Sequence, residues 1–93
     1  MRRNVLTKHS TKAERIVYEV LKATHTPFRH RWLIGGREVD FVLGTLCLEV
    51  NGHEQDIEKN HLLISLGYTP VHINNEDVTV EHIKQLLSYY NAY

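Results

Sequence analysis

Apolar and polar residues alternate along two neighbouring stretches in the middle of the chain. The apolar positions of these stretches are Val39, Phe41 and Leu43, followed by Leu46, Leu48 and Val50. A period of two residues is typical of β-strands, whose successive side chains point to opposite faces of a sheet. Gly44-Thr45 separates the stretches, and glycine at the first position of a two-residue loop favours a type II′ hairpin turn. The pattern therefore predicts an antiparallel hairpin over about residues 37–51.

The hairpin turn also predicts which side chains face each other. If Leu43 pairs with Leu46, the register places Asp40 directly opposite Glu49, with Cβ atoms roughly 5 Å apart. The same register places Glu38 opposite Asn51. Two like charges in such a position destabilise a strand pair. A divalent cation would explain them, because Mg²⁺ takes one or two protein carboxylates together with waters and substrate phosphate oxygens.

Two alternatives to a metal ion remain open from the pattern alone. The register can slip, which would separate the two carboxylates. Alternatively, Arg31 neutralises them, because a second tight turn at Gly35-Gly36 would pair Ile34 with Arg37 and so place Arg31 opposite Asp40.

Helices and further strands are predicted on both sides of the hairpin. Apolar residues recur at three- and four-residue spacing over residues 11–23, 54–66 and 78–90, which predicts helices, whereas residues 28–34 and 68–73 read as strands. The first strand is expected to place Phe28, His30, Trp32 and Ile34 on one face and Arg29, Arg31 and Leu33 on the other. The apolar surface of the second helix is expected to comprise Ile57, His61, Leu62 and residues 64–66. The order αβββαβα predicts an α/β fold with a mixed four-stranded sheet flanked by helices, in which the strand after the crossover helix runs parallel to its neighbour.

Length and composition suit one small domain that comprises residues 1–93. The chain has 93 residues, of which 42% are hydrophobic, and this is enough for a modest core. Residues 1–9 are polar and basic, so we expect them to form a flexible arm. The single cysteine, Cys47, excludes an internal disulfide and is expected to be a small packed side chain. No stretch reads as a membrane span or a signal peptide, so we expect a cytoplasmic protein without membrane contact.

Charge is distributed unevenly although the net charge is zero. Residues 1–40 carry nine Lys or Arg against four acidic residues, and residues 41–93 carry two Lys against seven acidic residues. A basic half favours contact with phosphate, and the alternative is an ordinary solvated surface. The basic side chains that we expect to contact DNA include Lys12 and Arg15.

The spacing of Asp40 and Glu49-Val50-Asn51 resembles the Asp…Glu-x-Lys signature of the PD-(D/E)XK nuclease superfamily. The sequence is most similar to the branch that contains very-short-patch repair endonucleases. The stretches that carry this resemblance are Glu14, Phe28-Arg29-His30-Arg31, Val39-Asp40-Phe41-Val42, Leu48-Glu49-Val50-Asn51-Gly52-His53, Asp56, Lys59, Leu63 and Gly67-Tyr68. The resemblance runs from about Glu14 to Ile73. It departs from the usual pattern at Asn51, where the superfamily usually has lysine, and in a shortened loop over residues 52–56.

The resemblance implies a restriction-endonuclease-like core and Mg²⁺-dependent hydrolysis of DNA phosphodiester bonds, in a bacterial or phage-like context. Asp40, Glu49 and the Val50 carbonyl would hold Mg²⁺, for which Mn²⁺ could substitute. Asn51 would orient the attacking water, and His53 is the nearest candidate for proton transfer.

Three further roles concern residues around these ligands. The resemblance directs Glu14 toward the metal site, whereas Thr11-Lys-Ala-Glu14 also reads as a capping box with a structural role. Arg29 and Arg31 are expected to contact DNA, and Arg31 is also suited to balancing the carboxylates. Lys59 is expected either to join the DNA-binding surround of the site or to form a solvated ion pair with Asp56.

A second function is also consistent with the sequence. Asn51 and the neutral net charge favour a catalytically weak nuclease-fold module that binds DNA or a protein partner. In either case, the apolar and aromatic C-terminal helix predicts a homodimer.

Overall fold

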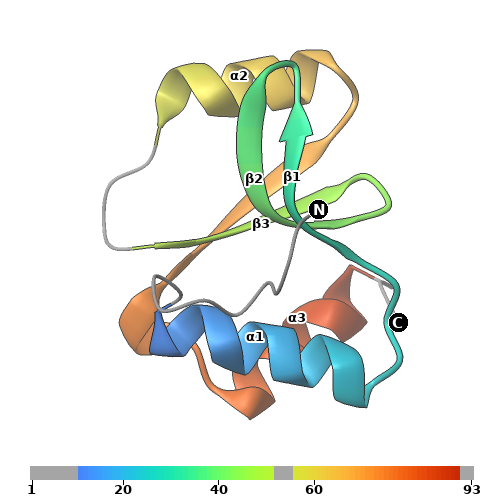
Figure 1. The fold of residues 1–93 in the computed structure, drawn as a ribbon, viewed down its shortest axis with the longest axis vertical. Helices are drawn as coiled ribbons and strands as arrows, with labels where there is room; N and C mark the ends of the chain where they lie inside the picture. Colours follow the sequence, from blue (N-terminus) through green and yellow to red (C-terminus); the bar gives the residue numbers. More distant parts are fainter. Residues whose placement is uncertain (1–10, 52–55, 91–93) are drawn as a thin grey trace, which may run out of the picture.

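A computed structural model of the protein describes residues 11–51 and 56–90. A four-stranded mixed sheet lies between helix α2 on one face and helices α1 and α3 on the other (Figure 1). The elements in chain order are α1 (Lys12–Ala23), β1 (Arg29–Ile34), β2 (Arg37–Leu43), β3 (Leu46–Asn51), α2 (Ile57–Ser65), β4 (Thr69–Asn74), a 3-10 turn (Asn75–Asp77) and α3 (Val80–Tyr89). The predicted α/β class and the order αβββαβα are confirmed.

The two glycine turns set the register of the three antiparallel strands. Gly44 has a φ of 63°, as the first position of the predicted turn requires, and Leu43 pairs with Leu46. At the other turn Ile34 pairs with Arg37, as predicted. Strand β4 lies beside β3 and runs parallel to it, which gives the strand order β1-β2-β3-β4. The expected parallel crossover through α2 is therefore confirmed.

Strand β1 departs from the predicted alternation at Arg31. The β1–β2 ladder includes His30 with Phe41 and Trp32 with Val39, but Arg31 has a left-handed backbone with a φ of 54°. This conformation costs a non-glycine residue about 1–2 kcal/mol, and it turns the strand so that the following side chains change face. His30 packs on Phe41 on the α1 side, with ring centroids 4.7 Å apart, whereas Ile34 joins the cluster beneath α2. The expectation that His30 and Ile34 share one face is wrong.

The core has two parts, one on each face of the sheet. Residues of α1 and α3 pack against the larger part, which includes Phe41 and Leu48, while Leu63 of α2 covers the smaller part. Leu63 is fully buried, whereas Ile57 and Ile64 are each 58% exposed. The apolar surface predicted for the second helix is therefore wrong, because only one row of this nine-residue helix reaches the sheet.

Cys47 is fully buried in the smaller cluster, as expected for a packed side chain. Burial raises the pKa of its thiol to about 11, so Cys47 is not a nucleophile at neutral pH. Within the described part of the chain, none of the helices has the length and apolar character needed to cross a bilayer.

Candidate functional site

Three acidic side chains from three elements interact electrostatically at one end of the sheet. They are Glu14 of α1, Asp40 of β2 and Glu49 of β3. Burial raises the pKa of Asp40, and the nearby charge of Glu14 raises it further. Burial raises the pKa of Glu49 to about 7, and the charge of Asp40 adds to this rise. Such perturbed carboxylates are typical of functional sites, because folding has placed like charges together at a cost in stability.

Asp40 lies where the β2–β3 ladder ends. The paired residues are Phe41–Leu43 and Leu46–Leu48, so the expected pairs of Asp40 with Glu49 and of Glu38 with Asn51 lie beyond the ladder. Instead, the Asp40 carboxylate accepts a hydrogen bond from the Val50 amide through Oδ2, at 2.8 Å. This bond fixes the carboxylate against β3 and leaves Oδ1 for another ligand.

Lys59 of α2 forms an ion pair with Glu49. Its Nζ lies 2.9 Å from Oε2 of Glu49, and both side chains are largely buried, at 16% and 5% exposure. The ammonium group lowers the pKa of Glu49, although burial outweighs this effect. Asp56 does not bind the Lys59 ammonium group. It caps α2 by accepting from the Lys59 amide, and its carboxylate binds Arg37.

Glu14 is held by two side chains of β1. His30 Nε2 lies 2.7 Å from Glu14 Oε2, and Arg31 donates to both carboxylate oxygens at 3.1 Å. Burial alone would raise the pKa of Glu14, but these hydrogen bonds hold it below its ordinary value. Thr11 does accept from the Glu14 amide, as in a capping box, yet the Glu14 side chain turns inward instead of returning to Thr11. The reciprocal half of the predicted capping box is therefore wrong.

Arg31 balances Glu14 directly and Asp40 only from a distance. Its hydrogen bonds to Glu14 raise the pKa of the guanidinium group, and the charge of Asp40 is a weaker cause of the same rise. The expected cross-strand partnership of Arg31 with Asp40 is therefore not formed. The left-handed backbone at Arg31 explains this, because it directs the side chain toward α1.

These carboxylates lie on a fold shared with a known nuclease domain. The catalytic domain of the homing endonuclease I-Bth0305I matches the chain with a TM-score of 0.67 and 26% sequence identity, over 88% of this chain and 92% of that domain. The fold is nuclease-like. No protein-family model and no curated protein matches the sequence.

Two histidines of the site were not predicted from the sequence. His30 lies in the Phe28-Arg29-His30-Arg31 stretch, where only the arginines were assigned roles. His72 aligns with Glu49 in the parallel β3–β4 register, and its Nε2 lies 3.1 Å from Oδ1 of Asn60. Burial, followed by the charge of Lys59, lowers the pKa of His72. The nuclease-like fold thus surrounds its carboxylates with histidines as well as with cations.

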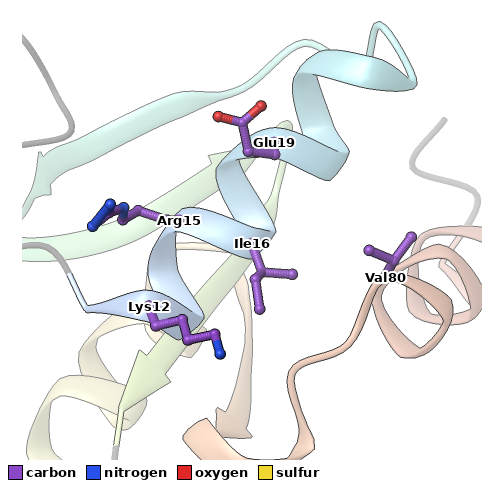
Figure 2. Close-up of a pocket in the computed structure, with 5 residues that line it drawn as sticks. All are labelled: Lys12, Arg15, Ile16, Glu19 and Val80. Carbon is purple, nitrogen blue, oxygen red and sulfur yellow. The ribbon is translucent and has the colours of Figure 1, made fainter.

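The other residues predicted for the site are Asn51, His53, Lys12 and Arg15. Asn51 ends β3 and aligns with Asn74, while His53 lies outside the described residues. Lys12 and Arg15 are exposed on the first turns of α1, beside a hollow of about 550 Å³ between α1 and α3. Figure 2 shows Ile16 and Val80 facing each other across this hollow. The hollow is also lined by Glu19, but Glu14, Asp40 and Glu49 do not line it.

The donor atoms of the site fit a hard cation such as Mg²⁺. Glu49 Oε2 is a buried carboxylate oxygen, for which a cation would compete with the Lys59 ammonium group, and Asp40 Oδ1 is not used by the Val50 amide. Among residues 11–51 and 56–90, no three His, Cys, Asp or Glu side chains are grouped closely enough to hold a metal ion by themselves. A cation here would therefore need waters, phosphate oxygens or the Val50 carbonyl, as Mg²⁺ commonly does.

The raised pKa of Glu49 predicts how stability depends on pH. Its pKa is about 7 in the folded protein against an ordinary value of 4.5, so the folded state binds the proton more tightly than the unfolded state. The free energy of unfolding of metal-free protein should therefore fall between about pH 4.5 and 7, by roughly 3 kcal/mol at most at 1.36 kcal/mol per pKa unit. Urea unfolding in EDTA at pH 5 and pH 8 measures this. Glu49→Gln should lose most of the dependence, and an unchanged dependence would assign it to other groups.

Proposed function

We propose that this protein is a metal-dependent endonuclease that hydrolyses phosphodiester bonds in DNA. The observation that carries the proposal is the meeting of Asp40, Glu49 and Lys59 on a nuclease-like fold. The homing endonuclease domain supports a nuclease function, and the two carboxylates supply the oxygen ligands that hydrolysis with Mg²⁺ or Mn²⁺ requires.

Each residue of the site has a defined part in this proposal. Asp40, Glu49 and the Val50 carbonyl hold the cation, which would polarise the phosphate and lower the pKa of bound water. Asn51 would orient the attacking water through its amide, and His53 would be the group that transfers a proton. Glu14 adds a third carboxylate to the site, since Arg31 and His30 hold its side chain near Asp40.

Lys59 provides the positive charge that Asn51 lacks. The superfamily signature has a lysine two positions after the glutamate, and asparagine cannot replace its charge. Lys59 reaches Glu49 from α2, with its ammonium group 2.9 Å from the carboxylate. We therefore assign Lys59 to stabilising charge at the reacting phosphate, in place of the peripheral DNA contact expected from sequence.

Cleavage of supercoiled plasmid tests the proposal directly. Purified protein with Mg²⁺ or Mn²⁺ should convert the plasmid to nicked or linear DNA, and EDTA should prevent this. The second candidate function is binding of DNA or of a protein partner without cleavage. It is favoured by Asn51, by the hydrogen bond of Asp40 with the Val50 amide and by the ion pair of Glu49 with Lys59. Binding without any metal-dependent cleavage would select that candidate.

The exposed basic residues of α1 should contact the DNA backbone. If Lys12 and Arg15 each neutralise one phosphate, the affinity of the protein for DNA should fall steeply with salt. The double change Lys12→Gln and Arg15→Gln should then flatten the log-log salt dependence by about 1.8, or about 0.9 for each contact. Fluorescence anisotropy with labelled duplex measures the slope, and Lys84→Gln on α3 is the control. An unchanged slope would remove α1 from the DNA interface.

We also propose that the protein is a homodimer. Tyr89 and Tyr90 are 78% and 39% exposed at the end of α3, and their ring centroids lie 4.8 Å apart, so this end of the helix offers aromatic surface to a second copy. Two subunits would provide two active sites for cutting both strands. Light scattering at tens of micromolar protein measures the mass, and a monomer with and without DNA would contradict the proposal.

A further inference from the structure

Strand β1 carries a pocket that the proposed cleavage chemistry does not use. The pocket has a volume of about 340 Å³, and it is lined by Tyr18, Phe28, Arg29, His30 and Trp32. Because β1 is one of the two edge strands of the sheet, the pocket opens on the outside of the molecule. Its size falls within the range of small-ligand sites.

The aromatic walls of this pocket are fixed to the core. Tyr18 and Phe28 meet edge to face, with ring centroids 5.4 Å apart, and Phe28 in turn packs on the buried ring of Phe41 at 5.9 Å. His30 also lies against Phe41. These contacts hold the rings in place before any ligand binds, so little conformational entropy would be lost from these side chains on binding.

The outer part of the pocket combines a cation with an exposed indole. The guanidinium of Arg29 lies 4.4 Å from the centroid of the Trp32 ring, and Trp32 is 45% exposed. None of the lining residues is acidic. Aromatic rings beside a guanidinium group suit a planar ligand that carries negative charge, since guanidinium groups both stack on aromatic planes and pair with phosphate.

His30 connects the pocket to the carboxylates. Its side chain lines the pocket, and its Nε2 lies 2.7 Å from Glu14 Oε2. The next residue, Arg31, also binds Glu14. A group held in the pocket would therefore lie one side chain away from the acidic site.

We propose that this pocket binds an unpaired nucleobase of the DNA strand being cut. The inference rests on the proposed nuclease function and specifies its substrate class. A base within a duplex is stacked and paired and cannot enter a pocket, whereas an unpaired base can stack on aromatic side chains. Arg29 would contact the phosphate of the same nucleotide. The protein should thus prefer DNA with an unpaired nucleotide beside the scissile bond over fully paired DNA.

The tryptophan of the pocket offers a direct measurement, because Trp32 is the single tryptophan of the chain. In EDTA, a short single strand and a duplex with one unpaired nucleotide should both quench its fluorescence to saturation. A fully paired duplex of the same length should quench it little. Equal quenching by paired and unpaired DNA would overturn the inference.

Variants of Trp32 test whether the binding of unpaired DNA depends on stacking. Trp32→Ala should weaken the binding of unpaired DNA roughly tenfold, as expected for the loss of one stacked base, and leave the binding of paired DNA unchanged. Trp32→Phe should retain most of the affinity because it keeps an aromatic plane. Leu33→Ala is the matched control, since Leu33 is an exposed apolar neighbour outside the pocket. An equal effect of Trp32→Ala on both kinds of DNA would overturn the inference.

Cleavage assays separate this inference from the proposed function. If the parent protein nicks plasmid with Mg²⁺ and prefers unpaired DNA, and Trp32→Ala loses that preference, both proposals are supported. If the protein nicks plasmid but shows no preference for unpaired DNA, the nuclease function stands and the pocket assignment is wrong. If the pocket binds unpaired DNA but no metal cleaves it, the pocket assignment stands and the nuclease function is wrong.

Discussion

Asp40→Asn should abolish metal-dependent cleavage while leaving the fold intact. The change removes a carboxylate from the proposed cation site, and the loss of several kcal/mol of charge stabilisation corresponds to a rate reduction on the order of a thousandfold or more. Asparagine keeps an oxygen that can accept from the Val50 amide, so the contact of β2 with β3 survives. Because burial and Glu14 already disfavour the charge of Asp40, the neutral variant should be as stable as the parent or up to about 1 kcal/mol more stable.

Plasmid nicking and thermal melting, each measured with EDTA and with Mn²⁺, test the prediction for Asp40→Asn. The parent should gain thermal stability from Mn²⁺, and the variant should gain none, because a ligand stabilises only the state that binds it. Asp77→Asn is the matched control, since Asp77 is an exposed aspartate of the 3-10 turn. A variant that melts far below the parent in EDTA would make Asp40 a structural residue. A stable variant that still cleaves would place the chemistry elsewhere.

Lys59→Met should lower the rate of cleavage by about 10²–10³, which is typical when one preorganised charge-stabilising group is lost. Methionine retains the length and apolar stem of lysine, and the backbone amide that caps α2 on Asp56 remains. The same change should strengthen the binding of Mn²⁺, because the ammonium group no longer competes for Glu49 Oε2. Cleavage and metal affinity should therefore change in opposite directions, which a purely structural role of Lys59 would not produce.

Single-turnover cleavage and the Mn²⁺ dependence of the melting temperature test the role of Lys59. Lys12→Met is the control, because it removes the same charge from an exposed position on α1 and should leave the rate at saturating DNA unchanged. If Lys59→Met and Lys12→Met reduce only DNA affinity and to the same extent, Lys59 is an ordinary DNA contact. If Lys59→Met weakens Mn²⁺ binding, Lys59 supports the site through structure and not through charge at the phosphate.

The features of the fold that were predicted correctly depend on residues close together in the sequence. Gly44 and Gly35 fix two tight turns, and alternation on either side then determines which strands pair and in which register. The helical crossover after β3 requires a parallel fourth strand. The placement of Asp40 and Glu49 near each other followed from this register, although the contact runs through the Val50 amide and not through a paired ladder.

The parts that sequence did not predict depend on the tertiary arrangement. Nothing in the strand pattern marks Arg31 as left-handed, because its conformation is compensated by the hydrogen bonds that its side chain makes to Glu14 on another element. The ion pair of Lys59 with Glu49 depends on how α2 lies over the sheet, and helix position is not encoded in spacing along the chain. From spacing alone, the capping box remained an open alternative for Glu14, and an ion pair with Asp56 remained one for Lys59.

The irregular backbone of β1 has a consequence for self-association. An exposed edge strand offers a row of free amide and carbonyl groups on which another chain can add a strand, and such addition leads to aggregation. Arg31 interrupts that row with a left-handed residue, and the charged side chain of Arg29 begins the strand. An incoming strand could not pair continuously along β1. Edge strand β1 is thereby protected against sheet extension, and a symmetric dimer would have to form on another surface, such as α3.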